Sequence, residues 1–308
     1  MKNVKFKPRQ IVRHKENVAG YVFLSPWLIG FFLFTIIPMV VSLYLSFTKY
    51  NITSAPVWTG LENYVRMFTN DLRFLNSLGV TFYYAIASVL LRLSFALLVA
   101  VLLTQKIKFA GLFRAVYYLP SLIGGSVAIA IIWRNLFASS GVVNTILQSI
   151  GIPIEISWLG SPHLAIWTLI IQQAWQFGSA MIIFAAGLTQ IPVTYHEAAS
   201  LDGAGAWRRF TKITFPLLSP IILFNLVMGI INAFKSFTQA YVITKGGPLD
   251  STMLYSLYIY KEAFEFFEMG YASALAWVLL VIVMAITALV FRTSNRWVFN
   301  ETSEGDKG

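Results

Sequence analysis

The chain is dominated by long apolar runs that carry almost no charge. A helix of about 20 apolar residues crosses a bilayer, because each residue adds about 1.5 Å and the hydrocarbon core is about 30 Å thick. Six such runs cover residues 20–46, 79–104, 115–136, 163–189, 216–240 and 271–291. A soluble domain of 308 residues has no core large enough to hide this much apolar surface. The sequence therefore predicts an all-α integral membrane protein with six transmembrane helices.

The composition agrees with this prediction and excludes several other classes. Hydrophobic residues make up 57% of the chain and charged residues only 12%, whereas disordered chains need low hydrophobicity. Cysteine is absent, which rules out disulfides, thiol nucleophiles and thiolate metal sites. The three histidines, His14, His163 and His196, do not have the spacing of metal ligands. We therefore expect neither a metal site nor catalytic residues.

The basic residues predict which helix ends face the cytoplasm. With the N-terminus inside, fifteen of the 23 Lys and Arg residues fall on cytoplasmic segments and six on the opposite side. Those cytoplasmic segments are residues 1–19, 105–114, 190–215 and 292–308. Both termini are then cytoplasmic, as an even number of helices requires. The net charge of +10 thus reflects membrane topology and not a nucleic-acid-binding surface.

No low-complexity stretch or flexible linker divides the chain. We expect a basic cytoplasmic segment over residues 1–19, one transmembrane domain over 20–292 and a cytoplasmic tail over 293–308.

The predicted cytoplasmic segment 190–215 has the pattern of two short helices joined by a turn. Thr194 followed three residues later by Glu197 is a capping-box pattern, which predicts that the first helix begins there. Asp202 and Gly203 predict its end, because glycine readily adopts the left-handed conformation of a helix C-cap.

A second short helix is expected from Ala206 to Lys212, before Pro216 opens the next transmembrane helix. Several alanines lie in the hairpin, namely Ala198, Ala199, Ala204 and Ala206. Their small side chains leave a smooth surface that suits close docking of another protein better than catalysis.

The same segment resembles a known motif. Glu197-Ala198-Ala199, followed by Asp202-Gly203, resembles the EAA loop of permease subunits in binding-protein-dependent ABC importers. Further segments extend the resemblance over about residues 20–292, and the chain is most similar to the carbohydrate-importing branch, the maltose and glycerol-3-phosphate type. They are GLENY at 60–64, FR at 113–114, LP at 119–120, GVVN at 141–144, ITFP at 213–216, TKGGP at 244–248 and GYASA at 270–274.

The resemblance implies a MetI-like, type I importer permease in a prokaryotic cell membrane, paired with a second homologous permease. It implies two ATPase subunits below and an extracytoplasmic solute-binding protein that delivers a sugar or oligosaccharide. In the family the EAA loop is the coupling helix that contacts the ATPase. Carried over, that contact is made by Glu197, Ala198, Ala199, Asp202 and Gly203.

The chain has no GxxxxGK[ST] phosphate-binding sequence. We therefore expect that it is not itself an enzyme and holds no cofactor, and that the partner ATPase subunits bind ATP and Mg²⁺.

Polar residues inside the predicted helices mark a candidate path for the substrate. In the run 216–240, a 4-3-4-3 spacing places Asn225, Gly229, Asn232, Ser236 and Gln239 on one helical face. A denser group in the run 163–189 is Gln172, Gln173, Trp175 and Gln176. Amides can hydrogen-bond sugar hydroxyls, and tryptophan offers a flat apolar face. The alternative is that these side chains only hold the helices together.

Arg92 lies near the middle of the second run, whereas all thirteen acidic residues lie outside the runs. Its partner could be a carbonyl, a second subunit, water or an anionic substrate. One interpretation is an interfacial or snorkelling arginine. The more specific hypothesis is that Arg92 binds an acidic carbohydrate, such as a uronate oligosaccharide.

Two other classes of membrane protein compete with an importer. An ion-gradient-driven secondary transporter commonly keeps an embedded acidic residue, which these runs lack, although carbonyls can bind sodium. An intramembrane enzyme needs nucleophiles or acid–base groups, and the runs hold no Cys, Asp or Glu and no clustered His. The importer permease is the function that the sequence favours.

Overall fold

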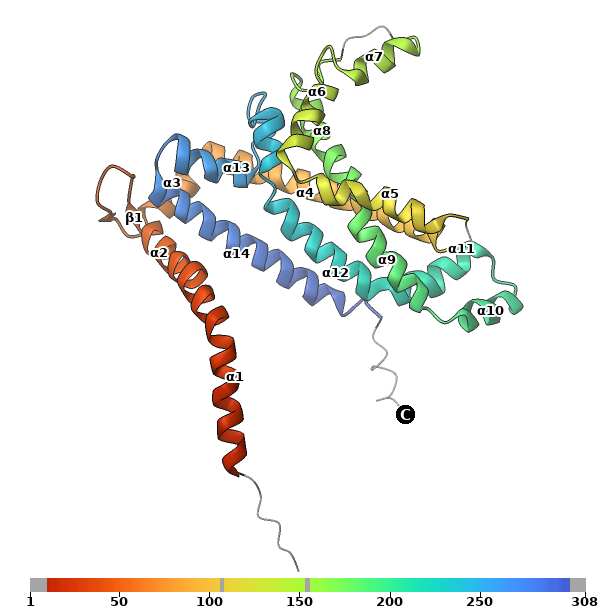
Figure 1. The fold of residues 1–308 in the computed structure, drawn as a ribbon. Coiled ribbons are helices and arrows are strands. Elements are labelled where there is room, and N and C mark those ends of the chain that lie inside the picture. Colours follow the sequence, from red (N-terminus) through yellow and green to blue (C-terminus); the bar gives the residue numbers. More distant parts are fainter. Residues whose placement is uncertain (1–9, 106–107, 153–155, 300–308) are drawn as a thin grey trace, which may run out of the picture.

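The computed structural model describes residues 10–105, 108–152 and 156–299, with side chains from residue 21 onward. The described chain is mainly helical, with a short antiparallel pairing of β1 (Thr48–Lys49) and β2 (Val57–Trp58). The long helices α4 (Leu72–Leu103), α12 (Phe215–Phe234) and α14 (Met269–Ser294) run side by side through the body of the molecule (Figure 1). The all-α prediction is confirmed.

Four helical stretches are long and apolar enough to cross a membrane by themselves. They are Tyr21–Ser46, Leu72–Leu103, Ala206–Phe234 and Met269–Ser294. Two bent helix pairs bring the number to six if each pair crosses once, in agreement with the six predicted spans. The assignment of the helix ends to the two sides of the membrane stays a prediction, and its residues 1–9, 106–107 and 300–308 lie outside the described residues.

The predicted single helix over 115–136 is wrong. The structure has α5 (Ala110–Ile123) and α6 (Val127–Leu136), which meet at 100°. Gly124 and Gly125 lie at the break, and Ser126 caps α6 because its Oγ accepts a hydrogen bond from the Ile129 amide at 3.3 Å. A serine N-cap supplies a partner for an amide that has none inside the new helix.

The predicted helix over 163–189 is also divided, into α8 (Pro162–Trp175) and α9 (Gly178–Gln190), with a bend of 42°. Its break at Gln176 and Phe177 lies against α5. A Cβ on Gly178 would approach the carbonyl oxygen of Tyr117 to 2.2 Å. Glycine therefore allows the two backbones to touch at the break.

The predicted helix over 216–240 ends early, at Phe234. The chain then turns and resumes as η3 (Ala240–Thr244), so Ser236 and Gln239 do not share a helix with Asn225. The prediction that all five polar residues lie on one helical face is therefore wrong.

Two prolines each lie two residues after the end of a π-helical turn. Pro38 follows η1 (Phe32–Ile36), which joins α1 (Gln10–Phe31) to α2 (Ile37–Ser46). Pro216 follows η2 (Phe210–Thr214), which joins α11 (Ala206–Arg209) to α12. Proline lacks an N–H and its ring clashes with the carbonyl four residues before it. The wider turn gives that carbonyl room, so each helix continues through its proline.

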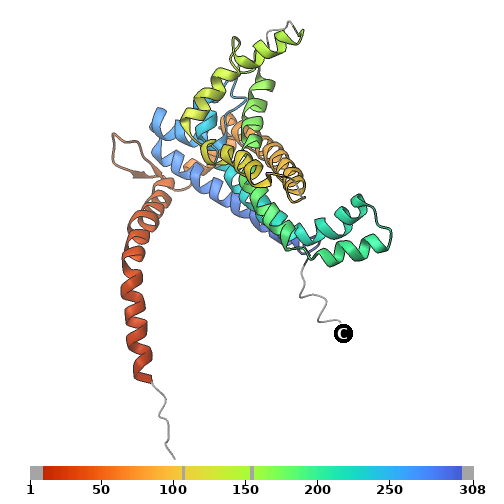
Figure 2. The same cartoon turned by 45° about the vertical axis from the view of Figure 1, so that its right-hand side comes forward.

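The remaining elements are short and lie toward the two ends of the bundle. They are α3 (Glu62–Thr69), α7 (Val142–Ser149), α10 (Val193–Leu201), α13 (Tyr255–Tyr260) and η4 (Lys261–Glu265). One buried cluster joins α3, α4, α13 and α14, and a second joins α4, α9 and α12. Figure 2 shows α1 leading away from this bundle, and none of its described side chains is buried.

Two motif asparagines organise loops, Asn63 beside α3 and Asn144 beside α7. The Asn63 side chain donates to the carbonyls of Ser46 and Thr48, both at 2.9 Å. The Asn144 side chain donates to the carbonyls of Ser139 and Ile156, both at 2.9 Å. A buried amide that replaces absent backbone partners in this way stabilises an irregular loop.

Candidate functional site

The predicted coupling hairpin, which we define as residues 192–209, projects from one end of the bundle (Figure 1). Its first helix, α10, begins at Val193 with Pro192 in the N-cap position. Thr194 therefore lies inside the first turn and makes no cap, so the capping-box prediction is wrong. Pro192 itself is not helical, with a ψ of 130°, and the helix begins directly after it.

The predicted end of α10 is confirmed. Gly203 has a φ of +74°. Its amide donates to the carbonyl of Ser200 at 3.1 Å, and the Ala204 amide donates to that of Ala199 at 2.8 Å. These are the two hydrogen bonds of a Schellman motif. The glycine thus fixes the angle between the arms of the hairpin.

The second arm differs from the expected short helix. The chain is helical without a break from Ala206 to Phe234, through η2 and Pro216. A force on the hairpin would therefore reach the bundle along one continuous helix.

The surface of the hairpin is exposed and partly apolar. Glu197, Ala198, Asp202 and Gly203 are exposed, and Ala199 is half-buried. Large apolar side chains lie beside them: Leu201 is 89% exposed and Trp207 is 76% exposed. The hairpin therefore presents both charged and apolar side chains at its surface.

A second set of predicted residues meets inside the bundle, where the two bent helices break side by side. The carbonyl of Gly124 accepts hydrogen bonds from Nε2 of Gln172 at 3.0 Å and of Gln239 at 3.3 Å. The carbonyl of Gln176 accepts from Nε of Arg92 and from Oγ of Ser121, both at 3.0 Å. We call these six residues the break cluster. A buried carbonyl freed by a helix break needs such a donor, because leaving it unpaired is costly.

Several predicted path residues are thus occupied by structural contacts. Trp175 packs on Trp133 with ring centroids 5.5 Å apart, and the indole of Trp133 donates to the carbonyl of Thr168 at 3.0 Å. Asn225 is buried and donates to the Ile221 carbonyl of its own helix at 3.0 Å. Hydrogen bonding between helices and within them accounts for these side chains.

Other path residues keep unpaired polar atoms. The side chains of Gln173 and Asn232 have no hydrogen bond to any described residue, and Asn232 is exposed. Oε1 of the fully buried Gln172 also has no partner among them. Ser236, in contrast, shares a hydrogen bond of 3.3 Å with the Tyr84 hydroxyl. Arg92 uses only Nε within the described chain, which leaves its terminal nitrogens available.

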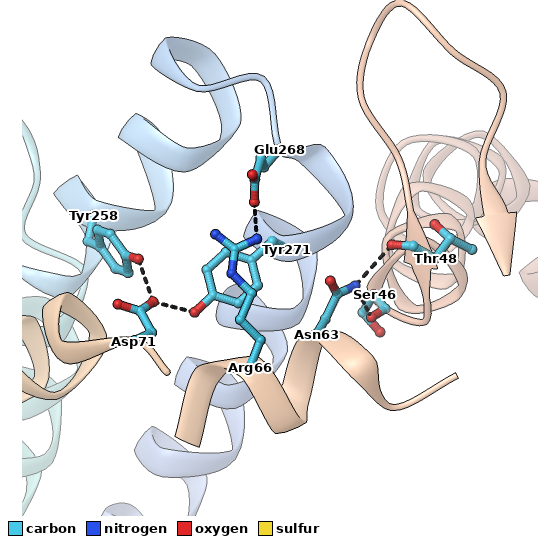
Figure 3. A network of polar contacts seen from close by, with 8 residues as sticks. All are labelled: Ser46, Thr48, Asn63, Arg66, Asp71, Tyr258, Glu268 and Tyr271. Atoms are coloured by element: carbon cyan, nitrogen blue, oxygen red, sulfur yellow. Dashed lines mark hydrogen bonds and ion pairs between the residues drawn. The ribbon is translucent and has the colours of Figure 1, made fainter. Parts of the chain in front are cut away.

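A third polar network, at the end of the bundle opposite the coupling hairpin, was not predicted (Figure 3). Asp71 caps α4 by accepting from the Phe74 amide at 3.0 Å, and it also accepts from the hydroxyls of Tyr258, at 2.6 Å, and Tyr271. Burial raises the pKa of Asp71, but the tyrosine hydrogen bonds outweigh it and hold that pKa below its usual value. The network joins α4 to α13 and α14.

Arg66 completes this network from α3. Its guanidinium pairs with Glu268 and lies 4.3 Å from the centre of the Tyr271 ring. Asp71 lies a few residues ahead of the second apolar run, and an aspartate in such a place is an N-cap signal that could have identified the start of α4. Its tyrosine partners lie 187 and 200 residues away in the chain, and no local pattern indicates them.

Comparison with known proteins identifies the family. Residues 109–299 match the family described as binding-protein-dependent transport system inner membrane component. The chain belongs to this family. The probable ABC transporter permease protein YesP of Bacillus subtilis is 56% identical to this permease over 292 residues, or 94% of each chain. The lactose transport system permease protein LacF of Rhizobium radiobacter is 33% identical, over 92% of this chain and 96% of that one.

A solved structure shows the same fold. It is a bacterial alginate ABC transporter in complex with an alginate pentasaccharide-bound periplasmic protein, and one chain aligns with a TM-score of 0.80 at 22% identity. The alignment covers 94% of this permease and 98% of that chain. This permease is therefore a multi-pass membrane protein of the ABC importer type, and its relatives are permease subunits and not enzymes. The family match includes the hairpin and every predicted path residue except Arg92.

Proposed function

We propose that this permease is one of two homologous transmembrane subunits of an ATP-driven importer for a sugar or oligosaccharide. The observation that carries the proposal is the exposed hairpin, with Glu197, Ala198 and Ala199 on a helix closed by Gly203 and rigidly continuous with α12. Support for a sugar comes from relatives named for lactose and for starch degradation products. An extracytoplasmic solute-binding protein delivers that sugar to the complex.

The proposed mechanism is alternating access. Two partner ATPase subunits bind ATP and Mg²⁺, close on each other and move the hairpins that are docked on them. Because α12 continues the hairpin without a break, the movement rocks the bundle toward its outward-facing state. The binding protein then releases the sugar into the path between the two permeases, and hydrolysis returns the complex to the inward-facing state. This chain itself holds no cofactor and lies in the cell membrane of a prokaryote.

The first experiment tests the coupling assignment. The complete transporter is reconstituted in liposomes with its binding protein, and sugar uptake and ATP hydrolysis are both measured. Glu197→Lys and Gly203→Asp should abolish binding-protein-stimulated hydrolysis and uptake, because one reverses a charge and the other strains a left-handed position on the docking surface. Thr189→Ala, an exposed position just before the hairpin, is the matched control. Normal transport in both variants would remove the coupling assignment, and ion-driven uptake without the ATPase would favour the secondary transporter.

The second experiment tests an acidic substrate. The terminal nitrogens of Arg92 are free to bind a carboxylate, and no acidic side chain in the described chain pairs with it. Arg92→Gln should reduce uptake of a uronate oligosaccharide more than uptake of a neutral one, and Arg92→Lys should retain part of the preference. Arg134→Gln, at an exposed arginine of α6, controls for net charge. Equal uptake of the acidic sugar by Arg92→Gln and the unmodified protein would exclude this role.

A further inference from the structure

The end of the described chain folds back onto the base of the coupling hairpin. After α14 ends at Ser294, one turn is closed by the Val298 amide, which donates to the Ser294 carbonyl at 2.8 Å. The next amide, that of Phe299, donates to Oγ of Ser219 on α12 at 2.9 Å. Ser219 is fully buried, and its own hydroxyl donates to the carbonyl of Pro216 at 2.6 Å. The serine thus ties residues 295–299, which we call the strut, to the first turn of α12.

The side chain of Phe299 lines an open hollow between the two arms of the hairpin. One wall of this hollow comes from α10 and includes Ala198, Ala199 and Asp202, and the other comes from the η2 and α12 arm. Phe299 is 38% exposed, so part of its surface faces the hollow. Three of the five predicted ATPase-contact residues therefore line the same hollow as this ring. An aromatic ring on the wall of a hollow between two helical arms limits how far the arms can close on each other.

The strut also connects the hairpin to the far end of the molecule. α14 packs against α2, α3 and α13 at the end that carries the Asp71 network. Its other end continues directly into the strut. A displacement of α14 would therefore move Phe299 within the hairpin.

We propose that Phe299, held by Ser219, is a positioning residue that sets the angle of α10 and transmits movements of α14 to the ATPase-docking surface. The inference rests on the proposed function, because α10 is taken as the coupling helix. Without the strut, α10 samples a wider range of angles, and part of the ATP hydrolysis by the partners occurs without transport.

The test uses the complete transporter in lipid nanodiscs and liposomes. The chain has no cysteine, so Ser200→Cys on α10 and Gln105→Cys beyond α4, both exposed, accept spin labels for a distance measurement. Phe299→Ala and Ser219→Ala should each broaden this distance distribution. Each should also lower the sugar transported per ATP hydrolysed by at least about fivefold, while the ATPase still co-purifies. Phe299→Leu should restore both readouts in large part, and Trp297→Ala, an equally large change in the same turn, should alter neither.

Unchanged distances and an unchanged transport ratio in Phe299→Ala would overturn the proposal, as would equal effects of Trp297→Ala. If the unmodified complex transports no sugar, the proposed function fails, whereas the distance measurement still decides whether the strut fixes α10. If Ser219→Ala does not fold, Phe299→Ala and its leucine counterpart decide the matter, because they change only a partly exposed side chain.

Discussion

A single methyl group added at Gly178 should lower the free energy of unfolding. It opens α9 at the break and faces α5, and an added Cβ would lie 2.2 Å from the carbonyl oxygen of Tyr117 and 2.6 Å from Cα of Tyr118. Both are backbone atoms of a helix and cannot rotate aside. Relief of the overlap requires the two helices to separate by roughly 1 Å, and overpacking of this kind costs about 1–3 kcal/mol.

The net effect of Gly178→Ala should be about 2 kcal/mol of destabilisation. Because the overlapping atoms cannot move, the overpacking cost should lie near about 3 kcal/mol. The better helix propensity of alanine offsets at most about 1 kcal/mol of it. The separation of the helices would also lengthen the hydrogen bond between the Ser179 amide and Oγ of Ser121, now 3.0 Å. Transport should therefore fall together with stability.

The assay is thermal unfolding of the purified complex, followed by the loss of monodisperse protein on heating. A loss of 2 kcal/mol corresponds to a lowering of Tm by about 5 °C. Gly125→Ala is the matched control, because nothing lies within 4 Å of its added Cβ. Gly187→Ala is the intermediate case: its Cβ meets only the flexible ends of Ile221 and Leu218, so its cost should be smaller. If Gly178→Ala is as stable as Gly125→Ala, the close backbone contact cannot be what the break requires.

Three further predictions concern single polar side chains. Asp71→Asn keeps the α4 cap but loses the charge, so it should lower the free energy of unfolding by about 2 kcal/mol at pH 7. Because folding lowers the pKa of Asp71, the stabilisation by its charge is lost as the pH falls through that pKa. The thermal unfolding curves of the two proteins should then coincide. Asn144→Asp cannot donate its two loop hydrogen bonds, and should speed limited proteolysis of residues 137–160 without unfolding the bundle. Asn232→Ala should raise the KM for the sugar about three- to tenfold, whereas Asn225→Ala, which loses only a bond within its helix, should not; the reverse result would contradict our placement of the path.

Local patterns predicted those features that depend on neighbours in the chain. Glycine after an aspartate predicted the turn at Gly203, and the apolar runs 163–189 and 271–291 predicted the outer ends of their helical segments within three residues. The π turn before Pro216 was not predictable in the same way. Proline ends some helices and is tolerated in others, and the outcome depends on whether tertiary packing stabilises the wider turn.

The break at Gly124 shows why the candidate site could be predicted only in part. Adjacent glycines permit a sharp bend but do not require one, since membrane helices tolerate glycine. The bend is stable because Gln172 and Gln239, which lie 48 and 115 residues further along the chain, both donate to the Gly124 carbonyl. The sequence identified these amides as polar groups at membrane depth. It did not contain the information that their partner would be a carbonyl of the same chain.

The break cluster also changes which residues can contact a sugar. A donor that already satisfies a backbone carbonyl cannot bind a hydroxyl without exposing that carbonyl, and an unpaired buried group costs about 1–3 kcal/mol. Gln239 and the Nε2 atom of Gln172 are therefore poor candidates for contacts that must form and break in every transport cycle. Three groups pair with no carbonyl in the described chain and can bind a sugar without exposing one: the side chains of Asn232 and Gln173 and the terminal nitrogens of Arg92. Because Arg92 is anchored through Nε to the Gln176 carbonyl, its charge is held beside the helix break while its other nitrogens stay available, and an anionic substrate would meet a fixed cation there.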